Sequence, residues 1–282
     1  MTTITLNKSI GANRNDLAYW WPILERTATD AGLQAHLPRT TIVRVEESLD
    51  PVLDGKPYEP FLRLVRALQD AASSYGYPCF LRTGHGSGKH EWERTCYVPS
   101  ADAMAAHVAA LIEWSACVDF VGLPTDTWVV REWLHLQTSF RAFSGRMPIN
   151  KERRYFFDER GIVCHHPYWP PAAVADGDPE RPDWREALDA LNRETLSERT
   201  ILGVLTGKLS KPFDGAWCMD WAQDNRGRWY VIDMALAKDA FHWKGCPERK
   251  HFRDDVDEEE RPPVDYDALL VPVGKGESDA EE

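Results

Sequence analysis

Apolar side chains recur three or four residues apart in four stretches of the chain. That spacing places them on one face of an α-helix. In the first stretch, Leu17, Trp20, Trp21 and Leu24 supply the apolar face. The pattern predicts helices over residues 16–31, 61–74, 102–115 and 183–208, the last as one helix or as two.

Shorter runs rich in β-branched and aromatic residues predict strands between these helices. Two of the runs are hairpins, because each is interrupted by a short turn that begins with Asp and ends with Gly. The expected strands cover residues 40–45, 79–83, 92–98, 127–133 and 139–143, together with the hairpins at 155–164 and 216–234.

The formal net charge of -12 is the first property that limits the function. A chain this acidic repels the nucleic acid backbone at long range, which argues against a general DNA- or RNA-coating protein. Whole-chain charge does not describe a local groove, however. No apolar run approaches the ~20 residues that span a bilayer, and the first 15 residues are polar. The sequence therefore predicts a cytoplasmic protein without a membrane span.

The six cysteines are scattered and form no C-x-x-C pair. Neither a zinc ribbon nor a disulfide framework is therefore indicated, and buried free thiols are the expectation. The run Cys164-His165-His166 also suggests a metal. We disfavour that interpretation, because neighbouring residues of a strand point to opposite faces.

The segment from Leu81 to Trp92 holds the most informative chemistry. Gly86 and its neighbouring glycines, with Ser87, let the backbone approach a ligand, and exposed N–H groups in such a turn bind anions. Arg82 and Lys89 flank the turn and add positive charge for phosphates. The spacing is not that of a Walker A loop. A plain hairpin is the alternative interpretation.

A second candidate segment is Val129 to Trp133, where apolar residues run into Arg131 and Glu132. An adenine requires an apolar slot with backbone donors and acceptors, and a ribose is bound by a carboxylate. The alternative is a buried strand that ends in a surface ion pair.

The closing hairpin carries Asp220 and Asp233 on adjacent predicted strands, each at the end of an apolar stretch. A buried carboxylate requires a cation, and Mg²⁺ takes one or two carboxylates plus phosphate oxygens. The alternative is that both carboxylates cap turns.

A dense basic cluster precedes this hairpin in an otherwise acidic protein. It could neutralise acyl-phosphate or triphosphate charge, or it could be the solvated face of a hairpin. Its members are Arg141, Arg146, Lys151, Arg153 and Arg154. No G-x-S-x-G, H-E-x-x-H or G-x-G-x-x-G motif occurs, so hydrolase, zincin and Rossmann functions are not indicated.

Taken in order, these segments resemble the ATP-grasp superfamily over residues 20–243. The similarity is to the divergent clade of the eukaryotic cell-division-cycle protein that assembles a translation initiation factor, with its phage and bacterial relatives. It is carried by an Arg-bearing strand, a Gly/Ser loop with a Lys, and four motifs: V-V-R-E-W, F-R-A-F, E-R-R-Y-F and W-Y-V-I-D. The resemblance implies an α+β fold of two small α/β subdomains that hold the nucleotide between antiparallel sheets.

The resemblance also implies roles for individual residues. Arg82 and Lys89, with Gly86 and Ser87, would hold the ATP phosphates. The adenine hinge would be formed by Val130, Arg131, Glu132 and Trp133. Arg131, Arg141 and Arg154 would line the phosphate and acceptor side, with Arg141, Arg154 and Lys89 as catalytic cations. Asp220 and Asp233 would bind Mg²⁺. The implied units are an N-terminal subdomain (1–75), the nucleotide-binding region (76–246) and an acidic disordered tail (247–282).

One departure from the family pattern affects the expected activity. The last acidic residue is usually followed at the second position by Asn, whereas this chain has Asp233-Met234-Ala235. The first expectation is an ATP-dependent carboxylate–amine ligase acting on a peptide or protein acceptor. The second is an ATP-binding assembly factor or chaperone without ligation, which Ala235 favours. The third is ATP-dependent joining of nucleic acid ends, supported by the basic cluster alone.

Overall fold

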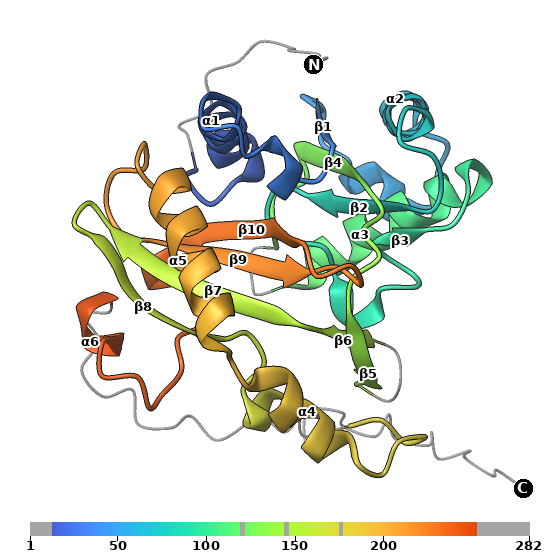
Figure 1. Ribbon diagram of the computed structural model, residues 1–282. Helices are drawn as coiled ribbons and strands as arrows, with labels where there is room; N and C mark the ends of the chain where they lie inside the picture. Colours follow the sequence, from blue (N-terminus) through green and yellow to red (C-terminus); the bar gives the residue numbers. More distant parts are fainter. Residues whose placement is uncertain (1–12, 119–121, 144–146, 175–176, 253–282) are drawn as a thin grey trace, which may run out of the picture.

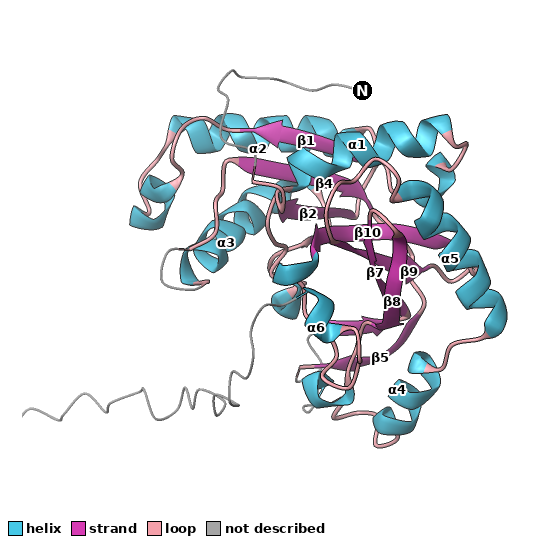
Figure 2. Ribbon diagram, turned by 90° about the vertical axis from the view of Figure 1, so that its left-hand side faces the viewer, coloured by secondary structure: helices cyan, strands magenta, loops and turns pink. Residues whose placement is uncertain are grey.

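Two four-stranded antiparallel sheets form the framework of the molecule (Figures 1 and 2). The computed structural model describes residues 13–118, 122–143, 147–174 and 177–252. Arg146 and residues 253–282 of the expected tail lie outside the described residues. Among the helices that are described, none is long and apolar enough to cross a membrane.

The first sheet has the strand order β1-β4-β2-β3. Its strands are β1 (Thr40–Arg44), β4 (Thr127–Glu132), β2 (Cys79–Thr83) and β3 (Tyr97–Val98). Alternate side chains of β4 point to opposite faces. Trp128 and Val130 pack against α2 (Glu59–Ser73) and α3 (Met104–Cys117), whereas Val129 belongs to the core of the second sheet. Arg131 therefore points toward the second sheet.

The second sheet has the order β10-β9-β7-β8. Its strands are β10 (Trp229–Leu236), β9 (Trp217–Gln223), β7 (Glu152–Asp158) and β8 (Gly161–Pro167). One face packs on α1 (Leu17–Asp30) and α5 (Leu196–Leu209), and α5 crosses in front of β9 and β7 in Figure 1. Trp217 and Trp221 are fully buried there. The opposite face carries Asp220 and Arg154 and packs in part against the segment that follows β10.

A smaller unit completes the fold. The β5 (Thr138–Ala142) and β6 (Met147–Asn150) strands form a two-stranded sheet that packs on α4 (Trp184–Asn192). After β10 the chain ends its described part in the short α6 (Arg249–Phe252).

The α+β architecture with two antiparallel sheets is confirmed, and most expected elements are present. The strand expected over residues 92–98 is wrong for its first five residues. Lys89–Glu91 form a 3₁₀ turn, and the N–H groups of Arg94 and Thr95 donate to the Glu91 carbonyl, so the chain coils before the short β3. The expected disorder from residue 247 does not hold for 247–252, because Phe252 is buried against Phe156. β1, which precedes the expected boundary at residue 75, pairs with β4, which follows it, so one sheet contains residues of both expected units. The division into units stays a prediction.

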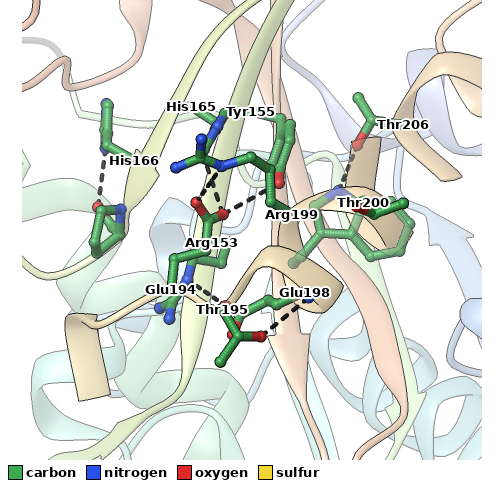
Figure 3. A network of polar contacts seen from close by, with 12 residues as sticks. Arg153, Tyr155, His165, His166, Glu194, Thr195, Glu198, Arg199, Thr200 and Thr206 are labelled. Carbon is green, nitrogen blue, oxygen red and sulfur yellow. Dashed lines mark hydrogen bonds and ion pairs between the residues drawn. The ribbon is translucent and has the colours of Figure 1, made fainter. Parts of the chain in front are cut away.

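A buried ionic network fixes β7 to the start of α5 (Figure 3). The Arg153 Nε lies 2.6 Å from a Glu198 carboxylate oxygen, and Lys151 Nζ lies 2.9 Å from the other. Arg153 also donates to the carbonyls of Leu191 and Arg193. Only 1% of the Arg153 side chain is exposed, so these two members of the expected basic cluster are not a solvated hairpin face. They lie on the α5 side of the sheet, on the face opposite to Asp220 and Arg154.

Candidate nucleotide site

A cavity of about 690 Å³ lies between the two sheets, and the small β5–β6 sheet closes one side of it. Its volume is within the range of small-molecule sites. Residues from β2, β4, β9 and β10 line it together with the loop after β2. The sequence-predicted site residues among them are Arg82, Gly86, Ser87, Lys89, Arg131, Glu132, Trp133, Arg141, Asp220 and Asp233. Val130 and Arg154 do not line the cavity.

The glycine-rich loop is tightly packed where it meets the cavity. A side chain at Gly86 would place its Cβ 2.6 Å from the Trp114 ring, so only glycine fits. Gly88 has φ of 59°, a left-handed conformation that also favours glycine. The N–H groups of His85 and Gly86 donate to the Thr83 hydroxyl. Part of the expected anion-binding nest is therefore already engaged within the loop.

Lys89 reaches from this loop across to Tyr168. Its ammonium donates to the Tyr168 hydroxyl at 2.9 Å and lies 4.2 Å from the centre of that ring. Burial alone would lower the pKa of Lys89, but the Tyr168 hydroxyl and the carboxylates of Glu152 and Asp220 outweigh it and raise the pKa above its ordinary value. Lys89 is therefore a permanent cation at the cavity wall.

Arg82 and Arg131 lie side by side on neighbouring strands and share one anionic neighbour. Arg82 Nη1 is 2.9 Å from an Asp233 carboxylate oxygen. Arg131 is 3% exposed, donates to the Ile232 carbonyl and stacks 4.6 Å from the Trp21 ring. Its Nε and Nη2 have no hydrogen-bond partner among the described residues. Burial and the charge of Arg82 lower the pKa of Arg131, which shows how poorly its charge is compensated.

The two predicted metal carboxylates occupy one row of the second sheet. Asp220 and Asp233 are directly opposite on β9 and β10, and Arg154 is opposite Asp220 on β7. Arg154 binds both oxygens of Asp220, at 2.7 and 2.8 Å, and donates to the Phe241 carbonyl. The alternative of turn-capping carboxylates is wrong, because both lie within strands and Asp224 caps the turn instead. Arg154 therefore acts on the cavity through Asp220 and through the cavity-lining Tyr168, whose ring centre lies 4.7 Å from its guanidinium.

The predicted adenine hinge divides between cavity and core. The Val130 side chain is fully buried among the residues between the first sheet and its helices, and its backbone pairs with both Thr41 and Leu81. The Glu132 carboxylate accepts from the Arg39 backbone and side chain, both at 2.8 Å, as in the surface-pair alternative. Trp133 lines the cavity and stacks on Trp92 at 5.6 Å. Trp92 and Trp133 thus give the cavity an apolar wall, whereas Val130 does not reach it.

Arg141, the remaining predicted catalytic cation, stands at the cavity edge on β5. Its guanidinium forms an ion pair with Glu93 at 2.9 Å and lies 5.6 Å from the Trp92 ring. It is about 40% exposed, so this pair is weak.

Magnesium would find its preferred ligand type here. Asp220 and Asp233 point to the same face beside the cationic residues, and carboxylates next to phosphate oxygens suit Mg²⁺. Ala235 is paired with Cys218 on β9 and, unlike asparagine, has no side-chain amide oxygen. Each carboxylate is ion-paired with an arginine in this structure. The residues therefore fit an ion that arrives together with phosphates.

Glu152 is the residue that sequence reasoning missed. It is 3% exposed, lines the cavity, and its Oε2 has no hydrogen-bond partner among the described residues. Burial raises the pKa of Glu152 to about 7, partly offset by Lys89. The only feature of the sequence that bears on Glu152 is its position directly before Arg153 and Arg154, and there it looks like a counter-charge within a basic surface cluster.

We expect Glu152→Gln to remove a pH dependence of stability. A raised carboxyl pKa means that the fold favours the neutral form, so the stability present near pH 4 is lost as the pH rises to about 7. As the pH rises from 5 to 8, the free energy of unfolding of the wild type, measured in urea, should fall by on the order of 2 kcal/mol relative to that of the variant. Exposed Glu186→Gln is the matched control; parallel pH curves for all three proteins would contradict the assignment.

Comparisons with known proteins bear on the fold. No protein-family model matches the chain, and no curated protein sequence matches it significantly. A solved structure of C-terminally truncated Cdc123 from Schizosaccharomyces pombe is 14% identical, covers 79% of this chain and 84% of its own, and has a TM-score of 0.48.

Two further solved structures are similar to this chain. The biotin carboxylase domain of Hydrogenobacter thermophilus 2-oxoglutarate carboxylase, determined with MgADP and bicarbonate, is 12% identical, with 79% of this chain and 39% of that chain covered and a TM-score of 0.45. A RimK domain ATP-grasp protein from Sphaerobacter thermophilus is 11% identical, with 79% and 59% covered and a TM-score of 0.40.

Proposed function

We propose that the cavity binds Mg-ATP and that the protein is an ATP-dependent carboxylate–amine ligase acting on a peptide or protein. The observation that carries nucleotide binding is Arg131. Its buried guanidinium has two nitrogens without a hydrogen-bond partner among the described residues. A buried cation is costly unless an anion meets it. A phosphate oxygen would supply that anion.

The rest of the cavity is arranged in keeping with this ligand. Arg82 and Lys89 line the same cavity as Arg131, and the stacked pair of Trp92 and Trp133 offers a flat apolar surface for a base. Trp–base stacking is worth about 1–3 kcal/mol. Asp233 would exchange its ion pair with Arg82 for the metal, releasing Arg82 to the phosphates.

The reaction would follow the resemblance to the family. A carboxylate oxygen of the acceptor bonds to the γ-phosphorus, the bond to the bridging oxygen breaks, and ADP leaves. The amine nitrogen then attacks the acyl carbon, loses its proton and displaces phosphate. In such a transfer the protein supplies mainly position and charge, and Lys89, Arg82 and Arg131 are the cations available for it.

A second function, an ATP-binding assembly factor without ligation, has its own support. Ala235 removes one expected metal ligand, and Arg154 holds both oxygens of Asp220. A metal held less firmly favours nucleotide binding over phosphoryl transfer.

Products of labelled ATP separate these functions. With α- and γ-labelled ATP and cell extract as a source of acceptors, we expect ADP that accumulates only with an acceptor fraction. Tight ATP binding without either product would favour the assembly factor. Label from the α-position on the protein, or released AMP, would instead indicate nucleotidyl transfer as in nucleic acid end joining.

We expect Lys89→Ala to weaken ATP binding by about 10- to 150-fold, the equivalent of a charged hydrogen bond worth ~1.5–3 kcal/mol. Isothermal calorimetry measures the affinity, and a thermal melt checks that the fold is intact. Exposed Lys208→Ala on α5 is the control and should bind like the wild type. An ATP affinity unchanged in Lys89→Ala would remove this lysine from the site.

A further inference from the structure

Three potential metal ligands meet on the second sheet, outside the residues that line the cavity. Cys164 comes from the edge strand β8, and His242 and Cys246 come from the segment that follows β10. Their ligand atoms all lie within 4.8 Å of one another, and Cys164 Sγ is 3.1 Å from His242 Nε2. His242 is buried, and the two cysteines are partly buried. The cluster joins Cys164 to residues 78 and 82 positions further along the chain.

The donor set selects the kind of ion. Two sulfurs and an imidazole are soft to borderline ligands, which suit zinc rather than magnesium or calcium. Zinc binds sulfur at about 2.3 Å and imidazole nitrogen at about 2.0–2.1 Å in a tetrahedron, so its ligand atoms stand roughly 3.5–4 Å apart. The ligand atoms observed here, all within 4.8 Å of one another and 3.1 Å apart for Cys164 and His242, bracket this spacing. In the contact between Cys164 and His242 the thiol proton lies between the sulfur and the imidazole nitrogen. A metal ion bound to both atoms would take the place of that proton.

A second imidazole lies beside the cluster. His166 is two residues after Cys164 on β8 and therefore points to the same face. Its Nδ1 is 2.9 Å from the Pro167 carbonyl, which can only accept, so Nδ1 carries the proton and Nε2 carries the lone pair. This Nε2 is buried and has no hydrogen-bond partner among the described residues. The ring centre is 5.2 Å from that of His242.

We propose that Cys164, His242 and Cys246 bind one zinc ion, with His166 as the fourth ligand. Backbone carbonyls orient both imidazoles, Pro167 for His166 and Trp243 for His242, as is usual for metal-bound histidines. His165, which points to the other face and stacks on Tyr155, is not part of the site.

The ion would act as a structural clamp. It would fasten the segment after β10 to the edge strand β8, next to the point where Phe252 packs on Phe156. The same segment supplies the Phe241 carbonyl to which Arg154 donates. Because Arg154 holds Asp220, the clamp would also steady the far end of the carboxylate row.

The test measures zinc in the full chain, purified under reducing conditions without a metal-affinity tag. Elemental analysis should find one zinc per chain in the wild type and in Cys117→Ala, which alters an exposed thiol on α3. Cys246→Ala and His242→Ala should lose the zinc, and His166→Ala should release it to a weaker chelator than the wild type does. A chelator should lower the Tm of the wild type but not of Cys246→Ala.

A second measurement uses the wild type alone, so its outcome does not depend on whether the variants fold. Cobalt added to the metal-free wild type should give thiolate-to-cobalt charge-transfer absorption and the strong d–d bands of tetrahedral coordination. Wild type that neither contains zinc nor gives these bands would overturn the proposal. Zinc retained by Cys246→Ala would overturn it equally. So would a protein that holds no zinc after reduction and that forms a Cys164–Cys246 disulfide in air, as detected by mass spectrometry. If His166→Ala releases zinc to the chelator no more readily than the wild type does, His166 is not the fourth ligand.

Discussion

Replacing Glu198 with alanine is expected to lower the free energy of unfolding by about 3–5 kcal/mol, because it leaves a guanidinium buried without its main counter-charge. Arg153 is 1% exposed and its Nε lies 2.6 Å from the Glu198 carboxylate. Lys151, only 19% exposed, would lose the same partner. For a protein of this size the loss corresponds to a fall in Tm of roughly 10 °C.

The matched control breaks an ion pair of similar length at the surface. Arg66 is 2.7 Å from Glu59 on α2, and both side chains are about 60% exposed. Arg66→Ala should therefore change the free energy of unfolding by about 0–1 kcal/mol. Chemical unfolding of both variants measures the difference. Similar small effects from Glu198→Ala and Arg66→Ala would mean that the network does not hold β7 to α5.

Much of the fold could be predicted from local patterns. Helices α1 to α3 and the hairpin of β9 and β10 follow from apolar spacing and from a turn that Asp224 and Gly227 define. The segment from Trp92 to Cys96 could not be predicted in this way. Its residues favour a strand by type, but Trp92 stacks on Trp133 and the chain coils to reach it. A contact with a residue far along the chain overrides local preference there.

The candidate site shows the same division. Arg82, Lys89, Asp220 and Asp233 could be assigned from the sequence because each interrupts or ends an apolar or glycine-rich run. Glu152 could not be, since its neighbours Arg153 and Arg154 read as one surface cluster. The strand then sends Arg153 to one face, and Glu152 and Arg154 to the other. The partners of Cys164 were equally hidden, because they follow β10 in a segment without regular structure.

The largest effect on ligand binding is expected from Asp233→Asn, which should make ATP binding at least about 100-fold weaker in the presence of Mg²⁺. The Asp233 side chain lines the cavity and is 42% exposed, so it can reach an arriving ion, and its replacement leaves the core intact. Asp220 is 3% exposed and held by Arg154. Asp220→Asn should therefore lower the Tm and weaken binding less than Asp233→Asn does.

Calorimetry with and without Mg²⁺ distinguishes metal binding from simple loss of charge. Without Mg²⁺, Asp233→Asn should bind ATP as well as the wild type or better, because Arg82 loses the carboxylate that competes with phosphate for it. The variant should thus lose the benefit of Mg²⁺ while keeping metal-free binding. Equal, mild losses in both variants under both conditions would mean that neither carboxylate binds the metal, and that Arg82 pairs with Asp233 for stability alone.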